Sequence, residues 1–129
     1  MADKENLTYN FPKEERLYKK KLIQELFENG SSFYLYPFKV LWMPNEEIAT
    51  HQIMVSVSKR KFKSAVTRNL LKRRIKEAYR LSKHENNFSG LQPSILIAYI
   101  YTGKQVHDSS LIHSKLKKTI SRLSKELSV

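Results

Sequence analysis

The side chains of this sequence that could do chemistry are its cations, and they are concentrated in one stretch. Residues 59–83 hold eleven lysines and arginines and a single acid, Glu77, so these 25 residues carry +10 of the chain's net charge of +12. One sign of charge gathered in this way favours a surface that binds a polyanion, with an ordinary solvated helix face as the alternative. The candidate binding side chains are Lys59, Arg60, Lys61, Lys63, Arg68, Asn69, Lys72, Arg73, Lys76 and Arg80.

The sequence lacks the residue sets of an enzyme that works alone. Its 129 residues include no cysteine, three glycines and four histidines that are not spaced as metal ligands, and its acids are adjacent only at positions 14–15 and 46–47. Thiol nucleophiles, glycine-rich phosphate loops and two-metal nuclease sites are therefore not indicated. We expect a binding protein with no catalytic residue and no metal ligand of its own.

A helix over about residues 64–82 must position most of these cations. The cations recur every four residues, and the apolar residues lie about 130° away around the helix axis, at Leu71, Ile75 and Ala78. Like charges at this spacing repel each other by a few tenths of a kcal/mol per pair. A bound polyanion is the expected compensation, so the pattern predicts a helix that docks on its apolar face and presents its cations outward.

Hydrophobic periodicity predicts the remaining elements. Residues 16–28 form an amphipathic helix, 31–36 a short strand, 38–43 and 53–58 alternating strands, and 109–127 a final amphipathic helix. Residues 95–101 are apolar on both faces, which is typical of a central strand. Residues 1–12 are polar without a period and are expected to be flexible. The order predicts a single domain over residues 1–129, with one sheet covered by helices.

Membrane and DNA partners are not expected. The longest apolar run, residues 95–101, has seven residues, whereas a membrane-spanning helix needs about 20. The first residues contain no apolar signal segment, which predicts a soluble cytoplasmic protein. A helix-turn-helix DNA binder needs two short helices joined by a tight turn, but a strand and a loop precede the basic helix.

Two motifs stand in a fixed order around the start of the basic helix. The first, at the end of a predicted strand, is Ser56-Val57-Ser58-Lys59-Arg60. The second, on the helix, is Ala65-Val66-Thr67-Arg68-Asn69, followed by Lys72-Arg73, Lys76-Glu77 and Arg80. Together they resemble the signature of the bacterial ribonuclease P protein component. The match extends more faintly over most of the chain, through Arg16-Leu17, the helix end at 22–30, Phe38 and the last helix.

The chain departs from that family pattern at two positions. The family commonly has arginine after the Arg-Asn pair, where this chain has Leu70. The family often has two phenylalanines four residues apart on the first helix, and this chain keeps Phe27 but has Ile23 at the other position.

The resemblance implies an α+β fold, a two-layer α/β sandwich with a mixed sheet of about four strands and three helices. It also implies a left-handed β-α-β crossover through the basic helix, as in the second domain of a small-subunit ribosomal protein. Right-handed crossovers are the rule in other folds.

The resemblance further implies the protein subunit of the ribonuclease P ribonucleoprotein. Its partners would be the catalytic RNA and precursor tRNA, whose 5′ leader is removed by the RNA with magnesium held mainly by that RNA. The basic helix and its preceding loop would bind RNA. A cleft between the first helix and the sheet would bind the leader through Ile23, Phe27, Phe38 and Val40.

Two alternatives stay open on the sequence. Another RNA-binding module, such as a ribosomal protein, would share the charge but not the paired motifs. By pattern alone, Ile23, Phe27, Phe38 and Val40 fit a hydrophobic core as well as a cleft.

Overall fold

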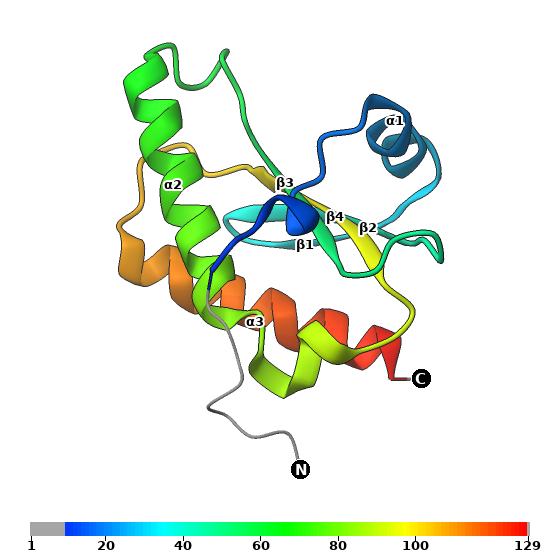
Figure 1. The fold of residues 1–129 in the computed structure, drawn as a ribbon. Coiled ribbons are helices and arrows are strands. Elements are labelled where there is room, and N and C mark those ends of the chain that lie inside the picture. Colours follow the sequence, from blue (N-terminus) through cyan, green and yellow to red (C-terminus); the bar gives the residue numbers. More distant parts are fainter. Residues whose placement is uncertain (1–9, 129) are drawn as a thin grey trace.

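The computed structural model describes residues 10–128, which form one mixed sheet with helices on both faces (Figure 1). The strands are β1 (Ser31–Leu35), β2 (Phe38–Pro44), β3 (Gln52–Val57) and β4 (Ile95–Tyr101). The α-helices are α1 (Lys20–Asn29), α2 (Ala65–Ser82) and α3 (Ser109–Leu127), and the short 3-10 helices are η2 (Lys13–Glu15) and η3 (Glu85–Gly90). None of the helices in this range is long and apolar enough to span a membrane.

The four strands lie in the order β1-β2-β4-β3. β1 pairs with β2 and β2 with β4 in antiparallel register, whereas β3 and β4 are parallel and are joined through α2. The predicted α+β class with a four-stranded mixed sheet is confirmed. β4 is the central strand expected from its sequence, and residues 95–99 are all fully buried.

α2 and α3 cover one face of the sheet and enclose the main core. Phe38 and Val40 of β2 and Tyr99 of β4 are fully buried there, against Leu71 and Ile75 of α2. Burial of one such side chain stabilises the fold by roughly 1.5–3 kcal/mol. The amphipathic pattern of the basic helix is therefore what fixes its orientation on the sheet.

α1 lies on the opposite face, which we call the α1 face (Figure 1). A second, smaller core forms there from Leu17, Leu26, Leu41, Leu96 and Ala98. Successive side chains of a strand alternate between faces, so β2 and β4 each contribute to both cores.

The first helix begins at Lys20 and not at Arg16, as its sequence predicted. Arg16 forms an isolated parallel bridge with Ile53, and the Leu17 N–H donates to the Ile53 carbonyl at 2.8 Å. The backbone at these residues is therefore extended along β3, and Leu17 packs in the smaller core without being helical.

Residues 10–19, the N-terminal segment, contact the body of the fold. The Phe11 ring meets the Tyr79 ring edge-on at a centroid distance of 5.9 Å, and the Asn10 carbonyl accepts a hydrogen bond from Lys83. Residues 1–12 were predicted to be flexible. Residues 1–9 of this range lie outside the described residues.

Candidate nucleic-acid interface

α2 holds its cations on the side away from the main core. Ser64 caps the helix by accepting a hydrogen bond from the Thr67 N–H at 3.3 Å, as a serine at this position commonly does. Leu71 and Ile75 are fully buried, whereas Arg73 and Lys76 are exposed. The predicted division of the helix into an apolar and a cationic face is confirmed.

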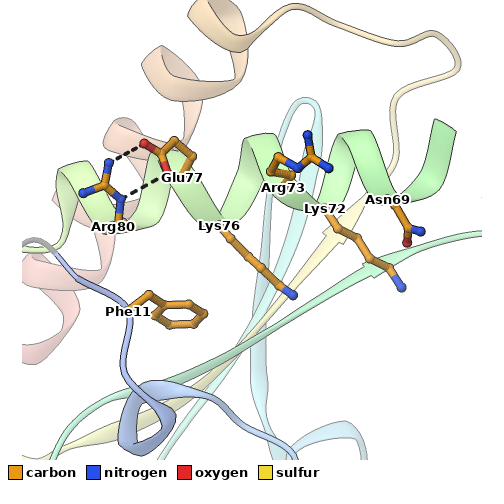
Figure 2. A pocket seen from close by; sticks show the side chains of 7 residues that line it. All are labelled: Phe11, Asn69, Lys72, Arg73, Lys76, Glu77 and Arg80. Atoms are coloured by element: carbon orange, nitrogen blue, oxygen red, sulfur yellow. Dashed lines mark hydrogen bonds and ion pairs between the residues drawn. The ribbon is translucent and has the colours of Figure 1, made fainter. Parts of the chain in front are cut away.

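A groove of about 510 Å³ runs along this cationic face and is the feature we call the α2 groove. Its lining residues are Phe11, Asn69, Lys72, Arg73, Lys76, Glu77 and Arg80 (Figure 2). Lys72 and Lys76 extend side by side from one side of the helix, and Phe11 reaches toward them from the N-terminal segment. Four cations with one acid make the groove suited to a polyanion.

Arg80 and Glu77 form an ion pair within the groove. Arg80 Nε donates to Glu77 Oε2 at 3.1 Å, and Arg80 Nη2 bonds the other carboxylate oxygen. The hydrogen bond from Arg80 lowers the pKa of the Glu77 carboxyl. The acid therefore stays ionised and offsets part of the charge of Arg80, which leaves Lys72, Arg73 and Lys76 as the main source of positive potential.

Arg68 folds back toward the loop that precedes α2. Its Nη1 donates to the Phe62 carbonyl at 2.8 Å and to the Lys63 carbonyl at 2.9 Å. A guanidinium hydrogen-bonded to two backbone oxygens fixes the shape of that loop. Arg68 is thus a positioning residue in this structure, and its contact with RNA stays a prediction.

Loop 58–64 presents its cations around a buried anchor. The Ser58 hydroxyl accepts from the Arg60 N–H at 3.1 Å, and the Phe62 side chain packs against Tyr101 in the main core. Lys61 Nζ bonds the Thr102 carbonyl at 3.3 Å. The exposed side chains of this loop, near the N-terminus of α2, are Lys59, Arg60, Lys61 and Lys63.

The prediction that Phe38 and Val40 line the cleft is wrong. Both side chains are fully buried in the main core, on the face of the sheet opposite α1. The alternation of β2 turns Lys39, Leu41 and Met43 toward the α1 face instead, where Leu41 and Met43 belong to the smaller core. A cleft between α1 and the sheet can therefore use these residues of β2 and not the predicted pair.

The two predicted cleft residues of α1 differ in their accessibility. Ile23 is half-buried against the smaller core, whereas Phe27 is 49% exposed. Phe27 is therefore the predicted cleft residue that is most open to a ligand.

Sequence reasoning missed Tyr34 and Lys39. They pair across β1 and β2, and Lys39 pairs with Ile100 of β4, which makes one row of side chains on the α1 face. Tyr34 is 59% exposed, and its hydroxyl accepts a hydrogen bond from the Thr102 hydroxyl. A lone lysine within the apolar strand 38–43 was the signal that this end of the face meets solvent.

Phe11 was missed as well, because only tertiary structure brings it to α2.

Among residues 10–128, no three histidine, aspartate or glutamate side chains gather as a metal-binding group. Glu77 is the one acid among the described residues that line the groove, and it is paired with Arg80. The groove is suited to binding a polyanion, and the described residues that line it include no set of side chains that could cleave one.

Comparison with known proteins gives consistent matches. The family model described as Ribonuclease P matches residues 11–124. The ribonuclease P protein component of Porphyromonas gingivalis is 33% identical over 120 residues, which cover 90% of this chain and 88% of that protein. That of Citrifermentans bemidjiense is 42% identical over 74 residues, which cover 57% of this chain and 62% of that protein.

Solved structures share the fold. The Staphylococcus aureus RNase P protein matches with a TM-score of 0.70 and 25% identity over 88% of this chain and 97% of that chain. The Thermotoga maritima RNase P protein matches with a TM-score of 0.66 and 24% identity over 84% of this chain and 96% of that chain.

Proposed function

The chain belongs to the ribonuclease P protein family, and from this premise we infer how its surfaces serve the ribonucleoprotein. It is the protein subunit of an endoribonuclease that processes tRNA, and its partner in the assembly is RNA. Another kind of RNA-binding module, such as a ribosomal protein, is not favoured by these matches. The proposals below concern which RNA each surface binds.

We propose that the α2 groove and loop 58–64 bind the catalytic RNA. The observation that carries this proposal is the groove itself, because Lys72, Arg73 and Lys76 point away from a helix face that is fully used by the core. Cations one helical turn apart lie about 6 Å from each other, close to the phosphate spacing along one strand. Arg68 would act indirectly, by holding the loop that presents the neighbouring lysines.

We propose that the α1 face binds the 5′ leader of precursor tRNA. Phe27 and Tyr34 offer exposed rings there, and Lys39, which pairs with Tyr34 across β1 and β2, adds a cation. A single-stranded leader has unpaired bases that can stack on aromatic side chains without being read for sequence. The two RNA surfaces then lie on different parts of the molecule, so one protein can hold both at once.

Chemistry in this arrangement is proposed to reside in the RNA subunit. Magnesium would be held mainly by that RNA, since phosphate oxygens are ligands that magnesium prefers. A protein that assists precursor tRNA processing in a bacterium is also proposed to work in the cytoplasm.

Cleavage of precursor tRNA tests the division of labour. We expect the catalytic RNA with this protein to release the leader faster, at low magnesium, than the RNA does without it. The protein freed of all RNA is expected to show no cleavage in magnesium. Cleavage that survives this purification, and that a point mutation in the chain abolishes, would refute the accessory role.

A further inference from the structure

Phe11 brings an aromatic ring to a groove otherwise made of charged and polar side chains. Among the seven described residues that line the α2 groove, it is the one with a ring (Figure 2). It comes from the N-terminal segment, more than fifty residues away in sequence from the cations of α2, and it reaches toward the end of Lys76. The ring packs against the main core and is only half-buried, so part of it stays open to the groove.

The backbone on both sides of this ring is fixed by charged groups. Lys83 Nζ donates to the Asn10 carbonyl at 2.6 Å. Arg16 donates to the Phe11 carbonyl through Nε at 3.2 Å and Nη2 at 2.9 Å, and its guanidinium lies 5.5 Å from the ring centroid. The ring is therefore held in place before any ligand arrives, which lowers the entropy lost on binding.

The groove offers places for both parts of a nucleotide. Lys72 and Lys76 lie one helical turn apart and suit two successive phosphates. Phe11 lies across the groove from Lys76 and supplies a ring on which a base attached to such a backbone can stack. The volume of about 510 Å³ is in the range of sites that enclose a small ligand.

We propose that the α2 groove binds an unpaired nucleotide of RNA, whose base stacks on Phe11 while its flanking phosphates contact Lys72 and Lys76. A base inside a duplex is already stacked on both faces, so only an unpaired base has a face free for the ring. This inference rests on the RNA-binding function proposed above and adds the state of the nucleotide that the groove selects.

Fluorescence anisotropy with the full chain tests the proposal on three labelled RNAs. The probes are a single strand of about 12 nucleotides, a blunt duplex of the same sequence, and a single strand with abasic sites throughout its middle. The variants are Phe11→Leu, which keeps an apolar side chain against Tyr79 without a ring, Phe11→Tyr, which keeps the ring, and Lys76→Ala. Thermal melting of each variant checks that the fold is retained.

We expect Phe11→Leu to weaken binding of the single strand by about 5- to 150-fold, the range that corresponds to one stacked base. The duplex should change by less than about twofold, and Phe11→Tyr should bind as the wild type does. For the wild type, the abasic strand should bind more weakly than the intact strand by at least this factor, since the α1 face is also proposed to stack unpaired bases. Lys76→Ala should weaken all probes and lower the salt slope by about one, since it removes a phosphate contact.

Equal binding of the abasic and intact strands by the wild type would overturn the proposal, whatever the variants do. So would a Phe11→Leu protein that binds single strands normally, or one that loses affinity for the strand and the duplex alike. Failure of the underlying RNA-binding function looks different, because wild-type affinity for every probe would then be insensitive to salt.

Discussion

The ammonium group of Lys83 lies 2.9 Å from Glu15 Oε1 and 3.0 Å from Glu15 Oε2, and it joins the end of α2 to the N-terminal segment. The two side chains are 3% and 15% exposed, so the pair is nearly removed from water. A buried charge is costly to leave unpaired, so the ion pair links the N-terminal segment to the end of α2 and its loss should destabilise both.

Lys83→Met is expected to destabilise the protein by about 3 kcal/mol, because it leaves the Glu15 carboxylate buried without its partner. Urea unfolding measures the change. The matched control is Lys117→Met, which breaks the ion pair with Glu85, where the side chains are 54% and 45% exposed, and should cost less than about 1 kcal/mol. Equal losses in the two variants would contradict the view that burial makes the Lys83 pair important.

Arg68→Ala and Lys72→Ala are expected to separate two roles that look alike in sequence. Arg68→Ala removes hydrogen bonds to the Phe62 and Lys63 carbonyls and should cost about 1–3 kcal/mol of stability. Lys72→Ala should cost less than about 0.5 kcal/mol. Both should weaken RNA binding. Denaturation curves and RNA titrations of the same preparations check this, and a fully stable Arg68→Ala protein would show that the loop holds its shape without the guanidinium.

RNA binding is expected to depend steeply on salt. If six to eight phosphates are neutralised, the logarithm of the association constant should fall with the logarithm of salt concentration at a slope of about −5 to −7. Lys72→Ala should reduce the slope by about one. The control is Lys125→Ala, which replaces an exposed lysine on α3 and should leave the slope unchanged. A slope near zero for the wild type would argue against a phosphate-binding surface.

Phe27→Ala is expected to raise the Kd of the assembled enzyme for precursor tRNA and to leave the Kd for mature tRNA nearly unchanged. The ring is 49% exposed, so its loss should remove stacking of roughly 1–3 kcal/mol without unfolding the protein. Ile23→Ala, by contrast, should mainly reduce stability, because Ile23 packs on the smaller core. A Phe27→Ala protein that folds and binds both tRNAs equally weakly would place the leader elsewhere.

His51 is expected to make stability depend on pH. Its Nε2 bonds the Phe88 carbonyl at 2.7 Å, and its Nδ1 accepts from the Ile95 N–H at 3.0 Å. Burial lowers the pKa of His51 from its ordinary value of 6.5, and the bond to the Phe88 carbonyl opposes this only in part. The unfolded chain therefore takes up the proton first, so stability is full above about pH 6.5 and is lost as the pH falls toward the lowered pKa.

Unfolding free energies between pH 8 and pH 5 measure this effect. His51→Gln removes the titrating group, so the unfolding free energy of this variant should fall less than that of the wild type at the acid end of the range. The rest of the chain is identical in the two proteins, so the difference between the two curves isolates His51. Parallel curves for the two proteins would mean that the buried imidazole does not couple folding to protons.

Several elements could be predicted from sequence because their periodic patterns are long. α3 has the bounds that its sequence predicted, and α2 begins one residue after the predicted start, since Ser64 is its cap. The first helix was predicted too long because Leu17 fits its apolar period. The Leu17 N–H instead bonds the carbonyl of Ile53, a contact between distant residues that no local pattern contains.

The candidate site was harder to predict, because strand patterns give two faces without saying what covers each. Phe38 and Val40 were correctly placed on the same face of β2, but only the packing of the folded chain shows that this face meets α2 and α3. Arg68 likewise has the right spacing for an outward cation, and its hydrogen bonds to loop carbonyls depend on side-chain geometry that spacing does not encode.

β4 contributes alternate residues to both cores, and this limits how the chain can change its length. Tyr99 belongs to the main core and its neighbour Ala98 to the smaller one. Deleting a single residue before them would exchange the two sets and place a large ring where α1 packs closely, while a methyl group would face α2. Insertions and deletions should therefore accumulate in the connections at 45–50 and 102–108, and β4 should keep its length even where its amino acids change.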